Sequence, residues 1–137
     1  MPAHLTGSCL CGAIGYTVRA EVRELRACHC TNCQKISGAG GTVNALVAAK
    51  DFEIVKGKPR RFTKTADSGR ILHRYFCGDC GSAIYSQREV TPDRVVVRAG
   101  GLDNAPPMKV TAHIWTRSAR PWDPIDPASH QVAGQPD

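Results

Sequence analysis

The sequence predicts a mainly β protein built from short strands. Val and Ile together number 18 and Thr adds nine, whereas Leu and Met together number eight. β-branched side chains pack well on a pleated sheet but lose rotamer freedom in a helix. Thirteen Gly and nine Pro supply frequent turns. We therefore expect about eight to ten short strands and very little helix.

Alternating apolar and polar side chains mark the strands in order along the chain. In the first expected strand, residues 14–18, the side chains of Ile14, Tyr16 and Val18 share one face. Later strands are expected at residues 71–76, 95–97 and 112–116, and a turn or two of helix at residues 32–36. Turn signals separate these segments at residues 38–41, 57–59, 67–69, 91–93 and 105–107.

The length of 137 residues fits one domain with an ordinary apolar core. We assign residues 1–122 to this domain, with its core at about residues 5–122, and residues 123–137 to a tail. The tail is rich in Pro and Asp and has little to bury. We therefore expect it to be loosely ordered.

Composition and charge exclude several classes of protein. No apolar run approaches the length of a membrane helix and the start resembles no signal peptide, so we expect a cytoplasmic protein without a membrane partner. The formal charge of +6 favours anionic partners. However, no Lys/Arg run exceeds two residues and aromatic residues do not interleave with basic ones. A nucleic-acid partner is therefore not expected.

The seven cysteines fall into three groups. The groups are Cys9-Leu10-Cys11-Gly12, Cys28-His29-Cys30-Thr31-Asn32-Cys33 and Cys77-Gly78-Asp79-Cys80-Gly81. An odd number of thiols in a reducing compartment does not suit disulfides, whereas C-x-C and C-x-x-C spacings suit metal ligation. The third group has the form of a zinc knuckle, in which glycines permit the tight turn.

Zinc chemistry gives the number seven a simple interpretation. A structural zinc site closes with four protein ligands, and a catalytic site keeps three and leaves one position open. The most economical partition joins Cys9, Cys11, Cys77 and Cys80 into one structural site. Cys28, Cys30 and Cys33 then form a second, open site, so two Zn²⁺ per chain are expected.

Other readings of the cysteines stay open at this point. Some thiols could be buried apolar side chains. The central group could also be a closed structural site that takes its fourth ligand from a histidine, such as His29 or His73. An iron–sulfur cluster is a third reading, which the C-x-C spacing disfavours.

The chain resembles the glutathione-dependent formaldehyde-activating enzyme family, also called the centromere-protein-V-like family. All three cysteine groups match, as do a segment at residues 101–103, the segment His113-Ile114-Trp115 and residues 118–122. The resemblance implies an Mss4-like fold of short antiparallel strands packed as folded sheets and held by a four-cysteine zinc site. It also implies that Cys9, Cys11, Cys77 and Cys80 hold the structural zinc, and that Cys28, Cys30 and Cys33 hold the catalytic zinc.

The activity implied by the resemblance is that of a carbon–sulfur lyase. Such an enzyme forms or breaks S-hydroxymethylglutathione, the adduct of glutathione and formaldehyde, or a related adduct of a small-molecule thiol and an aldehyde. His113 is a candidate proton shuttle for this reaction. The candidate cations that would neutralise the thiolates or bind the thiol's carboxylates are Arg26, Lys35, Arg70, Arg74, Arg98, Lys109 and Arg117.

Two other functions compete with the lyase. One is a non-catalytic zinc-binding module that binds a protein partner on the same fold. The other is the chemistry of the methionine-R-sulfoxide reductases, which need a reactive cysteine outside the zinc site. That chemistry returns only if the central group is metal-free and forms a disulfide, for example between Cys30 and Cys33. The sequence indicates no oligomeric state.

Overall fold

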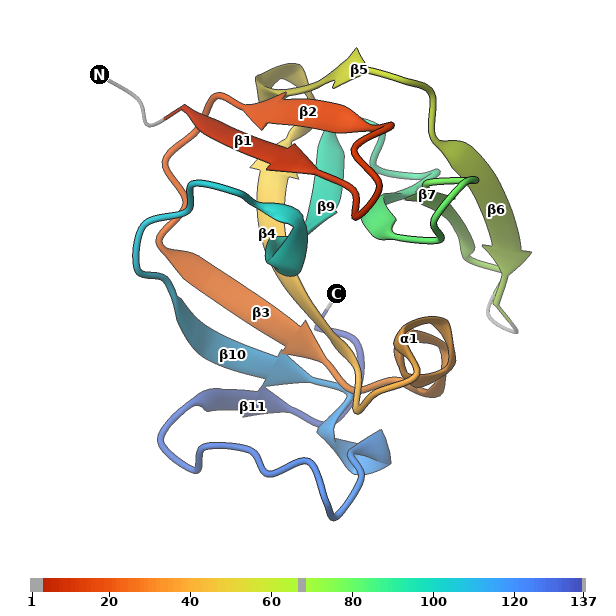
Figure 1. The fold of residues 1–137 in the computed structure, drawn as a ribbon. Helices are drawn as coiled ribbons and strands as arrows, with labels where there is room; N and C mark the ends of the chain where they lie inside the picture. The colour runs from red at the N-terminus through yellow and green to blue at the C-terminus, as the bar shows by residue number, and fades with distance from the viewer. Residues whose placement is uncertain (1–3, 67–68, 137) are drawn as a thin grey trace.

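The computed structural model describes residues 4–66 and 69–136 (Figure 1). Its strands form one sheet of three strands and one of eight. The small sheet has the order β1-β2-β5, from β1 (Leu5–Ser8), β2 (Gly15–Val18) and β5 (Phe52–Lys56). Residues 1–3 and 137, which the division into domain and tail includes, lie outside the described residues.

The large sheet has the order β11-β10-β3-β4-β9-β8-β7-β6. Its strands are β3 (Glu24–Cys28), β4 (Thr42–Ala48), β6 (Arg60–Thr65), β7 (Ile71–Phe76), β8 (Ala83–Arg88), β9 (Arg94–Arg98), β10 (Lys109–Ile114) and β11 (His130–Val132). The remaining elements are the helix α1 (Thr31–Ser37) and the single turns η1 (Ala49–Asp51), η2 (Ala99–Gly101) and η3 (Thr116–Ser118). The expected mainly β fold of two folded sheets is thus confirmed.

The main core lies between the two sheets. Tyr16 and Val18 of the small sheet are each 1% exposed, and they belong to the same buried cluster as Ala45, Val47 and Val97 of the large sheet. Figure 1 shows the small sheet lying over β4 and β9. Cys9 and Cys77 are members of this cluster, so one cysteine group is part of the core.

The opposite face of the large sheet is polar. Residues paired directly across neighbouring strands point to the same face. The register therefore places Arg26, Asn44 and Arg98 in one row across β3, β4 and β9. Arg74 and Ser86 lie in the next row, across β7 and β8. Strand alternation thus gives this sheet one dry face and one basic face.

Most strand pairs are antiparallel, but β10 is parallel to both of its neighbours. Ile114 pairs with Cys28 of β3 and with Val132 of β11. The segment after Trp122, for which the sequence suggests loose order, therefore contributes a strand. Its backbone also accepts hydrogen bonds from Trp115 N–H to Gly134 O at 3.3 Å and from Arg117 N–H to Ala133 O at 3.4 Å. Backbone pairing attaches this segment, together with the packing of Val132 against the buried cluster of Cys28, Cys33 and Ile114.

The local expectations agree with the structure to different degrees. Strand β7 covers the expected residues 71–76 and α1 covers residues 32–36. The strand expected at residues 112–116 ends at Ile114, because Trp115 adopts a left-handed backbone conformation with φ 57°. The turn expected at residues 67–69 falls partly on residues 67–68, which lie outside the described part of the chain. Within that part, none of the helices has the length and apolar character needed to cross a membrane.

Candidate metal centres and pocket

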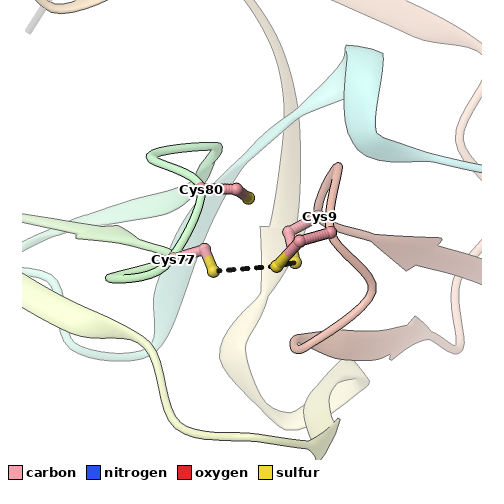
Figure 2. Close-up of side chains that lie close together, drawn as sticks. Cys9, Cys77 and Cys80 are labelled. Carbon is pink, nitrogen blue, oxygen red and sulfur yellow. Dashed lines mark hydrogen bonds between the residues drawn. The ribbon is translucent and has the colours of Figure 1, made fainter.

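Two turns bring four cysteines together between the sheets. Cys9 and Cys11 lie in the turn after β1, and Cys77 and Cys80 lie in the turn between β7 and β8. Each turn ends in a glycine with positive φ, Gly12 at 81° and Gly81 at 79°, a conformation in which a side chain would be strained. In Figure 2 the sulfurs of the two turns face one another.

The four sulfurs fit a tetrahedral zinc. All of them lie within 4.8 Å of one another. Cys11 Sγ lies 3.7 Å from both Cys9 Sγ and Cys77 Sγ. A Zn–S bond of about 2.3 Å sets a tetrahedral sulfur–sulfur distance of about 3.8 Å, close to these values. This cluster could therefore hold a metal ion, as ligand counting predicts.

Neighbouring donors hold the sulfurs in place. Ile14 N–H donates to Cys9 Sγ at 3.2 Å, and the Ser82 hydroxyl lies 3.2 Å from Cys80 Sγ. The side-chain and backbone hydrogen bonds of Ser82 lower the pKa of Cys80 to about 5. Leu10 N–H donates to the same hydroxyl at 3.0 Å, which links the two turns. These bonds favour thiolates, the form that binds metal.

The second cluster is local in sequence. Cys28 ends β3, Cys30 caps the N-terminus of α1, and Cys33 lies in the first turn of that helix. Cys30 Sγ accepts a hydrogen bond from Cys33 N–H at 3.3 Å. The three sulfurs lie within 4.8 Å of one another, and Cys28 and Cys33 are buried. The donor set, three soft thiols on one side, fits a zinc with one open position.

A chain of hydrogen bonds ends on the sulfur of Cys33. Arg98 Nη1 donates to Asn44 Oδ1 at 2.8 Å, Asn44 Nδ2 to Thr42 Oγ1 at 3.0 Å, and the Thr42 hydroxyl to Cys33 Sγ at 3.3 Å. Hydrogen bonds from Cys28 and Cys30, with smaller contributions from Thr42 and the charge of Arg98, lower the pKa of Cys33. Among the three sulfurs, the thiolate is therefore favoured at Cys33, whereas the hydrogen bonds with Cys30 and Cys33 raise the pKa of Cys28.

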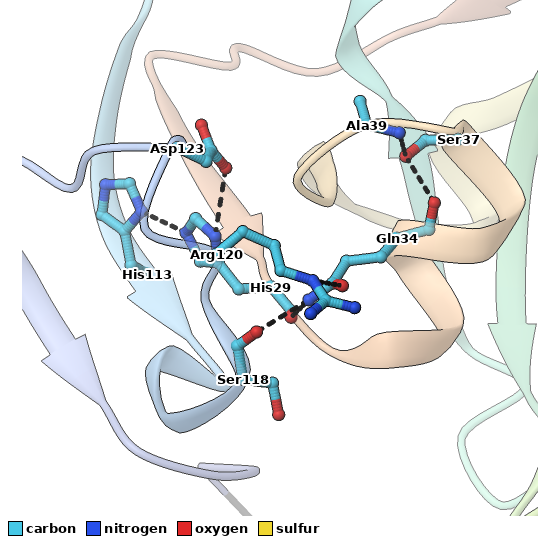
Figure 3. A network of polar contacts seen from close by, with 8 residues as sticks. All are labelled: His29, Gln34, Ser37, Ala39, His113, Ser118, Arg120 and Asp123. Atoms are coloured by element: carbon cyan, nitrogen blue, oxygen red, sulfur yellow. Dashed lines mark hydrogen bonds and ion pairs between the residues drawn. The ribbon is translucent and has the colours of Figure 1, made fainter.

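A polar network fixes the loop from the other side (Figure 3). Gln34 Nε2 donates to the carbonyl oxygens of His29 and Ser118, both at 2.8 Å. Arg120 Nε donates to Gln34 Oε1 at 2.7 Å. One buried amide thus joins the cysteine loop to the segment after β10.

His113 belongs to the same network. Its Nδ1 lies 2.8 Å from His29 Nε2, and His29 Nδ1 lies 3.4 Å from Asp123 Oδ2. Burial, followed by the neighbouring His29, lowers the pKa of His113. The His29 side chain belongs to this network. His73 has other partners: its Nδ1 lies 2.8 Å from Thr63 Oγ1, and its Nε2 lies 3.5 Å from Glu89 Oε1. Neither histidine is grouped with the three cysteines among the described residues.

A pocket of about 410 Å³ opens beside the three-cysteine cluster. Its floor is the basic face of the large sheet, and Cys28, Cys30 and Cys33 lie at one end. Trp115 and Gln135 contribute to a wall, where Trp115 Nε1 donates to Gln135 Oε1 at 3.0 Å. The volume is that of an ordinary small-molecule site. The four-cysteine cluster does not line this pocket.

The pocket lining is basic. It contains Arg26, Lys64, Arg70, Arg74, Arg88 and Arg98, and none of its described residues is Asp or Glu. Of the cations considered from sequence, Arg26, Arg70, Arg74 and Arg98 lie here, whereas Lys35 and Lys109 are exposed and outside it. The Arg117 guanidinium lies 5.3 Å from the centre of the Trp115 ring.

Several of these site residues carry no sequence signal of their own. The roles of Thr42 and Asn44 depend on cross-strand pairing, which no spacing in the chain reveals. Gln34 follows Cys33 directly, and Ser118 and Arg120 lie in a segment that carries the family resemblance. For these three residues, the family resemblance is the sequence feature that could indicate a role at the site. His113 is brought to His29 and is not part of the pocket lining among the described residues.

A comparison with family models gives one match over most of the chain. The model described as glutathione-dependent formaldehyde-activating enzyme covers residues 4–118. This range contains both cysteine clusters and ends before Asp123, Gln135 and β11.

Individual relatives are distant. A protein of Halomonas elongata named "Putative glutathione-dependent formaldehyde-activating enzyme" is 28% identical over 97% of this chain and 89% of its own length. A protein of the same name from Podospora anserina is 26% identical over 61% of this chain and 39% of its own length. A crystal structure of a Rhodobacter sphaeroides protein superposes with a TM-score of 0.60 at 22% identity, over 77% of this chain and 99% of the other. That likeness supports the fold.

Proposed function

The chain belongs to the glutathione-dependent formaldehyde-activating enzyme family, and on this basis we propose that it is a zinc-dependent carbon–sulfur lyase. Its reaction is the reversible addition of a small-molecule thiol, glutathione or a related thiol, to formaldehyde or a related aldehyde. Cys28, Cys30 and Cys33 hold the catalytic zinc in this proposal. Cys9, Cys11, Cys77 and Cys80 hold the structural zinc.

The observation that carries the proposal is the position of the three-cysteine cluster. It provides three ligands rather than four, and it lies at the end of a pocket of about 410 Å³. A zinc bound there would keep one position for the sulfur of the substrate and hold that sulfur as a thiolate. A purely structural site would need neither the open position nor the pocket.

The reaction balances without an oxidant or reductant. The thiol loses its proton, and the sulfur lone pair forms a bond to the carbonyl carbon of the aldehyde. The π pair of the carbonyl moves to oxygen, which takes up one proton and becomes the hydroxyl of the adduct. Elimination reverses each step.

The protein's own side chains support this chemistry by charge and position. Arg98 is linked through Asn44 and Thr42 to Cys33 and places a positive charge near three thiolates. Such a charge offsets the electrostatic cost of bringing a fourth, anionic sulfur into the site. The pocket confines thiol and aldehyde together, which reduces the entropic cost of their encounter.

The proton-shuttle role of His113 stays a prediction. The residue is buried against His29, and its lowered pKa keeps it neutral at pH 7. This geometry supports a positioning role instead, in which His113, His29 and Asp123 hold the cysteine loop. The two roles differ in their effect on pH profiles, since a positioning residue changes the rate at every pH.

Metal analysis of protein purified without chelator tests the function. We expect two zinc ions per chain, and a perturbed cobalt absorption spectrum in the more labile site when thiol is added. Exchange spectroscopy by NMR should then show faster formation of the thiol–formaldehyde adduct than in buffer. One tightly held zinc with no response to thiols would contradict the proposal and favour the non-catalytic interaction module.

A further inference from the structure

The pocket contains more positive charge than glutathione requires. Six of its side chains are arginine or lysine, and no carboxylate of a described residue lines it. Glutathione bound as a thiolate has a net charge of −2, since its ammonium group cancels one of its two carboxylates and its sulfur is anionic. Three cysteine thiolates on one Zn²⁺ would add −1, so the six cations still exceed the negative charge. The excess of cations therefore indicates a substrate with more negative charge than glutathione. This inference rests on the proposed function of the site.

Arg74 is the clearest sign of a missing anion. It lies on β7 with only 6% of its surface exposed, and it lines the pocket. Its buried Nε has no hydrogen-bond partner, and no ion pair with a described residue is formed by its guanidinium. A buried charge without a partner is costly, so proteins keep one where a ligand supplies the opposite charge.

A second and a third arginine add to this cost. Arg98 lies close enough to Arg74 for mutual repulsion, and its Nε is also buried without a partner. Arg88 pairs across the strands with Leu72, and its Nε is likewise buried without a hydrogen-bond partner. Repulsion between the Arg74 and Arg98 guanidinium groups lowers stability unless an anion lies between them.

The cations extend away from the cysteines in successive rows of the sheet. Cys28 pairs with Thr42, and the next row contains Arg98. Arg74 lies one row further and Arg88 two rows further. Rows two residues apart along a strand are separated by about 7 Å. Arg74 and Arg88 therefore face the end of a ligand that is remote from its sulfur.

We infer that the thiol substrate carries a compact group with at least two negative charges, a phosphate ester or a dicarboxylate, at the end remote from its sulfur. Arg74 and Arg88 bind this group, and Arg98 lies between it and the thiolate end. Guanidinium groups match phosphate and carboxylate oxygens with paired hydrogen bonds. The pocket volume leaves room for a molecule of about the size of a short peptide or a phosphorylated pantetheine.

Calorimetric titration of the zinc-loaded protein with defined probes tests this inference. The thiol probes are glutathione and two thiols that carry the anionic group remote from the sulfur, 4′-phosphopantetheine and N-(6-mercaptohexanoyl)glutamate. Pyrophosphate and citrate serve as anions that lack a thiol. We expect 4′-phosphopantetheine or N-(6-mercaptohexanoyl)glutamate to bind about tenfold or more tightly than glutathione. Competition by pyrophosphate alone identifies phosphate as the remote group, and competition by citrate alone identifies a dicarboxylate. Binding of glutathione as tight as that of both other thiols, without competition by either anion, would overturn the inference.

Substitution of Arg74 provides a matched test. In Arg74→Gln, binding of the preferred probe should weaken about 10- to 100-fold, whereas the ligand-free protein should melt at a higher temperature. Arg61→Gln is the control, because Arg61 is exposed on β6 and lies outside the pocket. If Arg74→Gln melts at a lower temperature and binds all probes normally, the arginine is structural and the inference fails. Arg88→Gln repeats the binding test if Arg74→Gln does not fold.

The outcomes separate this inference from the lyase itself. Anion binding that depends on Arg74, without adduct formation from any thiol and aldehyde, would remove the proposed function and keep an anion site. Rapid adduct formation from glutathione, with no effect of pyrophosphate, citrate or Arg74→Gln, would keep the function and remove the remote anion.

Discussion

The two cysteine clusters use the same ligand atom in opposite surroundings. The four-cysteine cluster joins two turns that are far apart in sequence, and Cys77 within it is 1% exposed. Its neighbours are backbone N–H groups and the hydroxyl of Ser82. The three-cysteine cluster comes from one short segment, and its neighbours are a pocket, a charged arginine and a relay of polar side chains.

In the roles proposed above, this difference would separate a structural site from a reactive one. In the first, all ligands come from the protein, and metal binding would attach the small sheet to the large one. In the second, the missing ligand and the surrounding cations leave room and charge for a substrate. Both sets of sulfurs lie within 4.8 Å, so sulfur spacing alone does not distinguish them.

The largest expected effect is on stability, from a change in the four-cysteine cluster. Cys80→Ser should lower the free energy of unfolding by about 4 kcal/mol or more, because the energy of a closed metal site is also folding energy. Urea denaturation followed by circular dichroism measures this change. Ser82→Ala removes a neighbouring hydroxyl but no ligand and serves as the control. If the Cys80→Ser protein is as stable as the Ser82→Ala protein, the four-cysteine cluster does not stabilise the fold as predicted.

The next effect is on function, from a change in the three-cysteine cluster. Cys30→Ser should lose one zinc per chain and adduct formation, while the free energy of unfolding falls by at most about 2 kcal/mol. The reason is that the three ligands come from one short segment, so a metal bound there closes no long loop of the chain. Zinc content by mass spectrometry and urea denaturation, run in parallel, check both statements. Equal loss of stability in Cys30→Ser and Cys80→Ser would show that the two sites share one structural role.

The smallest effect concerns the polar relay, which the four-cysteine cluster lacks. Thr42→Val removes the hydroxyl that donates to Cys33 Sγ, and this should raise the pKa of Cys33 and weaken zinc binding about 10- to 100-fold. Competition with a chromophoric chelator measures the affinity. Thr65→Val, an exposed position on β6, is the control. Unchanged affinity in Thr42→Val would mean that the relay positions the sheet and does not tune the sulfur.

The sequence predicts the fold class and the grouping of cysteines because both depend on local patterns. β-branched composition, alternation and C-x-C spacing are visible within a few residues, and the clusters gather as ligand counting suggests. The relay from Arg98 to Cys33 is not visible, since it depends on the register of β4 and β9. The strand β11 was missed because it is three residues long and has no apolar pattern.

The sequence alone also does not show which cations lie on the basic face of the large sheet. Arg74 and Arg98 were candidates from sequence, but so were Lys35 and Lys109, which lie on the surface. Only the sheet register places some of these charges in one pocket. The position of His113 also depends on a long-range contact, with His29 far away in the chain.

The parallel pairing of β10 with β3 has a consequence for the order of folding. Ile114 and Cys28 are neighbours in space but are separated by most of the chain, so their contact closes a long loop. The small-sheet hairpin and the β6–β7–β8 meander need only nearby residues and can form earlier. During synthesis, the thiols of Cys28, Cys30 and Cys33 leave the ribosome long before Trp115, which packs against their cluster in the folded protein. Oxidation or premature capture of metal in the unfinished chain is therefore the hazard that this topology creates.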